Sequence, residues 1–166
     1  MESVQQEGSA LSVHQDTEER VGEFMEKDFD RGELIRRALE QQPAAYAPYS
    51  GYYVGAAVLM DSGKIYTGVN VENASYPAGI CAERNAISHA AACGERKIIA
   101  IAVVGGMQGD NREYATPCGV CRQVMREFCD PKEMRVLLAR TPEDYKEMTL
   151  EELLPESFGP ENLAVR

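Results

Sequence analysis

Two short cysteine motifs constrain the fold of this 166-residue chain more than any other feature. The first reads CAE at residues 81–83, and the second reads PCGVC at residues 117–121. Each opens a segment with a helical pattern, and an apolar stretch of strand length, residues 97–106, lies between them. A metal site that draws on both motifs requires the two helix starts to meet in space.

The rest of the chain alternates between strand and helix patterns. Strands are expected over residues 52–60, 65–71, 97–106 and 134–139, and helices over 30–42, 81–93 and 117–129. The turn DSGK joins the first two strands, and Thr149 with Glu152 predicts a capped short helix near the C-terminus. This order predicts a single mixed sheet sandwiched by helices.

The N-terminal part differs in composition from the remainder. Residues 1–28 are rich in Gln, Glu and Ser, and their large apolar residues are few and irregular. We expect a flexible or weakly helical extension there, followed by one folded domain over residues 29–166.

Composition indicates which kind of molecule the protein binds and in which cellular compartment it is expected. The net charge of −10 and the absence of a Lys/Arg run argue against a nucleic-acid partner and favour a small neutral substrate. No apolar run approaches the roughly 20 residues of a membrane span, and the N-terminus lacks a secretory pattern. A cytoplasmic location is therefore expected. There, five cysteines are metal ligands or free thiols rather than disulfides, and we predict that Cys93 and Cys129 are buried or half-buried free thiols.

The cysteine motifs predict a catalytic zinc site. Zinc held by Cys81, Cys118 and Cys121 keeps a fourth position open for water, which distinguishes catalytic from structural zinc. Glu83, two residues from a ligand, can exchange protons with that water without binding the metal, as in zinc deaminases. A CxxC motif alone would also suit a redox site or half of a structural zinc site. His89 lies about two helical turns from Cys81, roughly 12 Å along the axis, and is too distant to be a fourth ligand.

Three thiolates give such a site a net negative charge that needs compensation. The two helix N-termini supply partial positive charge and N–H donors at the sulfur atoms. Arg84 is predicted to donate a hydrogen bond to a thiolate from just outside the ligand set.

Longer matches identify a family. The segments AYAPYSGYYVGAAV, GVNVENASY, CAER, PCGVCRQV and EELLPESF resemble the small, homotetrameric, zinc-dependent cytidine deaminases, from about Leu34 to Phe158. The resemblance implies an α/β fold, a three-layer α/β/α sandwich with a five-stranded mixed sheet, and one Zn²⁺ per chain. It implies hydrolysis of cytidine and 2′-deoxycytidine to uridine and 2′-deoxyuridine with release of ammonia, in pyrimidine salvage, with Glu83 as proton shuttle.

The resemblance also implies how a nucleoside binds. Asn70 and Glu72 match the pair that binds the ribose, and the backbone at Ala82 matches the group that holds the carbonyl side of the pyrimidine. Tyr52 stands where the family usually has Phe beside the base. Its ring keeps a stacking face, while its hydroxyl either tunes selectivity or points to water.

Three further positions match residues that complete a neighbouring subunit's site in the family: Ala74, Tyr76 and Phe158. This role depends on the resemblance, as does the expected homotetramer.

Two alternatives remain open. The same chemistry could act on an aminonucleoside antibiotic such as blasticidin S or on a cytosine in RNA, although Asn70 with Glu72 favours a nucleoside and the acidic composition disfavours RNA. A non-catalytic zinc-binding module would instead have four closed ligands.

Overall fold

The computed structural model describes residues 28–163. The extension predicted over residues 1–28 lies outside the described residues except for Asp28, so its expected flexibility stays a prediction. Internal contacts group the chain from Arg31 onward into one unit.

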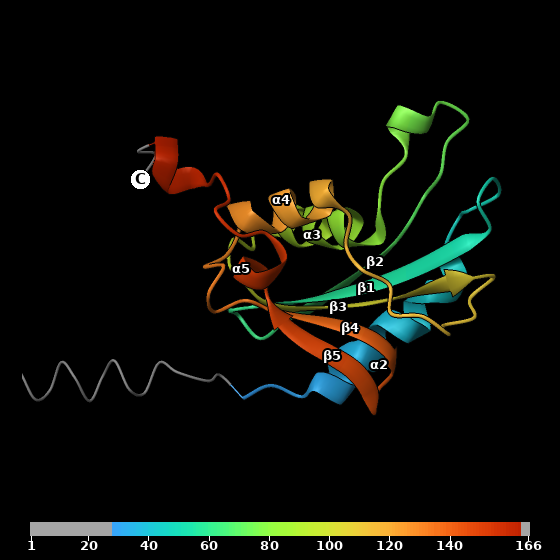
Figure 1. Cartoon of the computed structure of the whole chain (residues 1–166), viewed down its shortest axis with the longest axis horizontal. Helices are drawn as coiled ribbons and strands as arrows, with labels where there is room; N and C mark the ends of the chain where they lie inside the picture. The colour runs from blue at the N-terminus through green and yellow to red at the C-terminus, as the bar shows by residue number, and fades with distance from the viewer. Residues whose placement is uncertain (1–27, 164–166) are drawn as a thin grey trace, which may run out of the picture. The chain divides into compact units, whose positions relative to one another are not determined.

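A five-stranded sheet with helices on both faces forms this unit (Figure 1). The strands are β1 Tyr52–Met60, β2 Ile65–Val69, β3 Ile98–Met107, β4 Arg135–Thr141 and β5 Asp144–Thr149. The α-helices are α2 Arg31–Gln41, α3 Ala82–Ala92, α4 Gly119–Glu127 and α5 Leu150–Leu153. Three 3₁₀ turns are η1 Gln42–Ala44, η2 Tyr76–Ala78 and η3 Pro160–Leu163. Among the described residues, no helix has both the length and the apolar character needed to cross a bilayer.

The sheet is mixed, with strand order β2-β1-β3-β4-β5. Strands β3 and β4 pair in parallel, and the other neighbours pair antiparallel. The parallel pair needs a crossover, and α4 provides it on the face that also carries α3 (Figure 1). The predicted α/β sandwich with a five-stranded mixed sheet is confirmed.

Strand β5 is the one strand that the residue pattern did not indicate. Its sequence, DYKEMT, is half-buried to exposed because it forms an edge of the sheet and pairs only with β4. Edge strands carry polar residues and lack the clear apolar alternation of half-buried strands. Thr149 ends this strand and caps α5 through the predicted reciprocal hydrogen bonds with Glu152.

The core has two parts, one on each face of the sheet. Leu34, Ile35 and Ala38 of α2 are buried against one face. On the other face, α3 and α4 pack over Val58 and Val103, within a cluster of buried aliphatic side chains. This second layer positions the amino ends of α3 and α4, where both cysteine motifs lie.

One cysteine prediction was wrong. Cys93 is exposed, because α3 ends at that residue and the chain turns away at Gly94, whose φ is +90°. Cys129 is half-buried, as expected.

A close helix–strand contact sets the position of α3. A Cβ added to Gly68 of β2 would lie 2.6 Å from the Ala82 carbonyl oxygen, and this backbone cannot move without shifting α3. We therefore expect Gly68→Ala to lower the free energy of unfolding by about 1–3 kcal/mol, measured by urea denaturation. At Gly119, an added Cβ meets no atom within 4 Å, so Gly119→Ala is the matched control and should not destabilise the protein. Equal stability of the two variants would contradict the close packing.

Candidate metal centre

The three predicted ligands sit at the starts of two helices. Cys81 is the N-cap of α3 and Cys118 is the N-cap of α4, both in extended backbone conformation. Cys121 is the third residue of α4 and points into the core. Neither N-cap side chain accepts a hydrogen bond from its own helix, and both sulfur atoms lie at the positive end of a helix dipole.

The sulfur atoms are spaced as one tetrahedral metal ion requires. Sγ of Cys118 lies 3.9 Å from Sγ of Cys81 and 3.5 Å from Sγ of Cys121, and all three lie within 4.8 Å of one another. Zinc–sulfur bonds of about 2.3 Å at tetrahedral angles place neighbouring sulfur atoms about 3.8 Å apart. Among the described residues, no other histidine, cysteine or carboxylate group joins a potential metal-binding cluster. Since Cys118 is exposed, the centre is reachable from solvent.

The three thiols already polarise one another. Hydrogen bonds from Cys121, then from Arg84 and Cys118, lower the pKa of Cys81 to about 5. The pKa of Cys121 is raised, because its proton is shared with Cys81 and its side chain is buried. The thiolate form is therefore favoured at Cys81, the ligand closest to Arg84.

Arg84 makes the predicted contact with the sulfur atom of Cys81. Its Nη2 donates to Sγ of Cys81 at 3.7 Å and to the Gly79 carbonyl oxygen at 3.3 Å. This guanidinium would offset part of the negative charge of three metal-bound thiolates, and it fixes the loop that leads into α3.

Glu83 is a buried carboxyl group beside the thiols. Only 4% of the residue is exposed, and desolvation raises its pKa above the ordinary value. A hydrogen bond from Cys121 acts in the opposite direction. A carboxyl group with a raised pKa holds a proton more readily than an ordinary carboxyl group, which favours its use in accepting and returning one.

Asn70 and Glu72 lie at the start of the loop between β2 and α3. An isolated β-bridge between Val71 and Ile80 joins the two ends of this loop, which brings Asn70 and Glu72 near Cys81. The Asn70 amide accepts from Val54 N–H and donates to the Tyr52 carbonyl, while the Glu72 carboxylate accepts from two backbone N–H groups of residues 49–50. Hydrogen bonds from the Ser50 hydroxyl group and from the backbone N–H groups of Tyr49 and Ser50 lower the pKa of Glu72, which favours its ionised form.

Two other predicted residues come from α3 and β1. Ala82 is fully buried in the first turn of α3. The Tyr52 ring packs where Gly105 leaves space, and burial, with the charge of Glu113, raises the pKa of its hydroxyl. The Tyr52 hydroxyl is consequently neutral near pH 7.

The three residues matched to intersubunit positions are all exposed in this single chain. Tyr76 is 75% exposed and Phe158 is 58% exposed, and Ala74 lies on the same outward loop as Tyr76 (Figure 1). Among the described residues, no recorded contact joins these three residues to the thiols of their own chain.

Two supporting residues escaped the sequence analysis. Asn85 lies one helical turn after Cys81, and its amide donates to the Val69 carbonyl at 3.0 Å, which ties α3 to the end of β2. Arg122 donates to the Pro117 carbonyl at 2.8 Å and steadies the turn that carries Cys118. The i, i+4 spacing from each N-cap cysteine could have indicated both.

A search against family models matches residues 30–137 to the cytidine and deoxycytidylate deaminase zinc-binding region. The chain is 45% identical over 134 residues to a cytidine deaminase of Halalkalibacterium halodurans, covering 81% of this chain and 98% of that protein. It is 38% identical over 132 residues to a probable cytidine deaminase of Dictyostelium discoideum, covering 80% and 86%.

Solved structures agree with the sequence matches. The crystal structure of cytidine deaminase from Burkholderia pseudomallei superposes with a TM-score of 0.69 at 43% identity, covering 76% of this chain and 97% of that one. The likeness thus extends over nearly the whole of a solved chain.

Proposed function

This chain belongs to the zinc-binding family of cytidine and deoxycytidylate deaminases, and we propose from that membership that it hydrolyses cytidine and 2′-deoxycytidine to uridine and 2′-deoxyuridine with release of ammonia. The observation that carries the proposal is the group of three thiols, spaced for one zinc ion, beside the buried carboxyl group of Glu83. Cys81, Cys118 and Cys121 would hold the metal. When bound, zinc supplies Lewis acidity and makes water nucleophilic near neutral pH.

Glu83 is the proposed proton carrier. Its side chain would take a proton from the attacking water and deliver it to N3 of the pyrimidine. It would then take the remaining proton from the added hydroxyl group and deliver it to the departing amine, which leaves as ammonia. Burial supports this role, since it raises the pKa of Glu83 and thereby reduces the cost of holding the proton between the two transfers.

Asn70 and Glu72 are proposed to bind the sugar. Their contacts with the backbone of residues 49–54 hold both side chains in place, and each side chain keeps hydrogen-bonding capacity beyond these contacts. The backbone at Ala82 would bind the carbonyl side of the base, and the Tyr52 ring would stack against it.

A homotetramer is proposed as the assembly, in which Ala74, Tyr76 and Phe158 would complete the nucleoside site of a neighbouring copy. Its support is the exposure of Tyr76 and Phe158, two large rings that a single chain leaves in solvent. A cytoplasmic location and a place in pyrimidine salvage belong to the same proposal; the free thiols of all five cysteines support a reducing compartment.

The proposal is tested by incubating the purified, zinc-loaded protein with cytidine, 2′-deoxycytidine, blasticidin S and a cytidine-containing oligoribonucleotide. We expect loss of the cytidine absorbance and release of ammonia with both nucleosides. A chelator should abolish turnover and added zinc should restore it. Turnover of blasticidin S or of the oligoribonucleotide alone would change the substrate class. Tightly bound zinc with no turnover of any substrate would favour the non-catalytic module.

A further inference from the structure

The C-terminal segment, residues 154–163, lies against the outer face of α4 through polar contacts. Leu154 packs against the hydrophobic core, but most of the residues after it are exposed, so apolar burial contributes little to holding them. Instead, the Gln123 amide donates to the Phe158 carbonyl at 3.0 Å, and Arg122 donates to the carbonyl of Leu153, just before the segment, at 2.7 Å. The segment is therefore held by directional contacts, which specify position more than stability.

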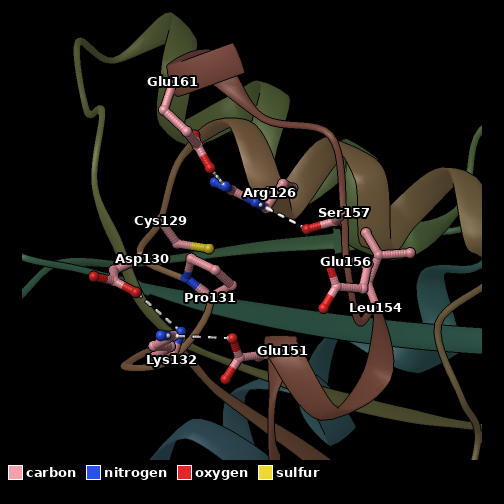
Figure 2. Close-up of a pocket in the computed structure, with 10 residues that line it drawn as sticks. All are labelled: Arg126, Cys129, Asp130, Pro131, Lys132, Glu151, Leu154, Glu156, Ser157 and Glu161. Atoms are coloured by element: carbon pink, nitrogen blue, oxygen red, sulfur yellow. Dashed lines mark hydrogen bonds and ion pairs between the residues drawn. The ribbon is translucent and has the colours of Figure 1, made fainter.

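Arg126 makes two further contacts with the segment (Figure 2). Its side chain comes from the last turn of α4, donates from Nε to Ser157 Oγ at 3.0 Å and forms an ion pair with Glu161. These groups border a cavity of about 580 Å³ at the C-terminal end of α4. Only 7% of the Arg126 side chain is exposed, whereas 60% of the Glu161 side chain is exposed.

The segment is shaped to receive this guanidinium. Gly159 is buried, and a Cβ there would overlap the Arg126 guanidinium. Arg126 thus contacts the residues on both sides of Phe158, Ser157 by a hydrogen bond and Gly159 by close packing. Together with Gln123, it restrains the backbone that carries the exposed ring of Phe158.

Burying a guanidinium costs desolvation energy that one ion pair and one hydrogen bond offset only in part, so Arg126 is a weak source of stability. Its contribution is to fix the position of the C-terminal segment relative to α4. Helix α4 also carries Cys118 and Cys121 at its other end, so the Phe158 backbone is held by the same rigid element as two of the metal ligands.

We propose that Arg126 is a positioning residue that holds Phe158 in place to cover the nucleoside in the site of a second copy of this chain. The inference rests on the proposed function, because it takes the substrate and the subunit contact from it. An aromatic ring that is held in advance loses little conformational entropy on binding, so the contact benefits substrate affinity.

Kinetics test the positioning role in the full-length, zinc-loaded enzyme. We expect Arg126→Met to raise KM for cytidine about tenfold while kcat changes by less than about twofold, the signature of a lost binding contact. Glu127→Gln, at the next and exposed position of α4, is the matched control and should keep the wild-type KM. An unchanged KM in the Arg126 variant, or a fall in kcat alone, would overturn the proposal.

A second measurement does not depend on activity. The chain has no tryptophan, so Phe158→Trp introduces a single fluorophore at the ring itself. Adding Arg126→Met should move its emission to longer wavelength and lower its anisotropy, whereas adding Glu127→Gln should change neither. If the Met variant does not fold, Glu161→Gln weakens the same contact from the exposed side and should give the same changes at smaller size. Identical spectra in all folded variants would refute the role of Arg126.

Mixed oligomers show whether Phe158 acts in the site of its own chain or in the site of a neighbouring copy. Chains with Arg126→Met keep an intact metal centre, whereas chains with Glu83→Gln keep a correctly held Phe158. In co-assembled oligomers, we expect part of the turnover to recover the wild-type KM. A KM that stays raised in every mixture would show that the ring acts on its own chain. A wild-type enzyme that deaminates no nucleoside would refute the proposed function instead, while the fluorescence comparison would still report on Arg126.

Discussion

Substitution of Glu83 by glutamine is expected to lower kcat for cytidine by about 10³- to 10⁴-fold, the contribution that a well-placed acid–base group makes to a proton-transfer reaction. Glutamine has nearly the same shape and keeps a hydrogen-bonding oxygen atom, but it cannot take up and release a proton. The expected loss therefore falls on turnover, while KM changes little.

Zinc content separates this loss from damage to the metal centre. The potential metal-binding group among the described residues consists of three cysteines and does not include Glu83, so the variant should retain one zinc per chain by elemental analysis. Glu95→Gln is the matched control, since Glu95 is also a buried glutamate but bonds to Ser62 and Tyr66, away from the thiols. Near-normal kcat in the Glu83 variant would remove Glu83 from the reaction.

The second large effect concerns the buried ligand. We expect Cys121→Ser to reduce bound zinc to less than about a tenth of one ion per chain and to lower activity by about 10³-fold or more, because a serine hydroxyl is not deprotonated near neutral pH and two thiolates bind zinc far more weakly than three. Dialysed protein is assayed for zinc by elemental analysis and for deamination by absorbance.

Cys93→Ser provides the comparison for that experiment. Cys93 is a free, exposed thiol at the end of α3, so replacing it makes the same chemical change without touching the metal-binding group. It should retain zinc and activity. Full zinc occupancy in the Cys121 variant would mean that this sulfur atom is not a ligand. Far-ultraviolet circular dichroism of both variants checks that the sheet and helices persist.

Local patterns in the sequence were sufficient for most elements of the fold. The apolar run of residues 97–106 and the DSGK turn predicted β3 and the β1–β2 hairpin, because a buried strand and a tight turn each have a characteristic pattern within a short stretch of sequence. β5 was missed, because its polar edge position leaves no such pattern. Cys93 was placed wrongly, since burial at a helix end depends on whether another element covers it.

By itself, the sequence determined the chemistry available: three cysteines and a glutamate at the starts of two helices, in spacings that suit one zinc ion and one proton carrier. Only the tertiary structure decided that the sulfur atoms meet within 4.8 Å, that burial raises the pKa of Glu83, and that α4 restrains the Phe158 backbone through Arg126. The reason is physical: residue type and short spacings act through local conformation, whereas convergence, desolvation and contacts between distant segments arise only when the sheet brings those segments together.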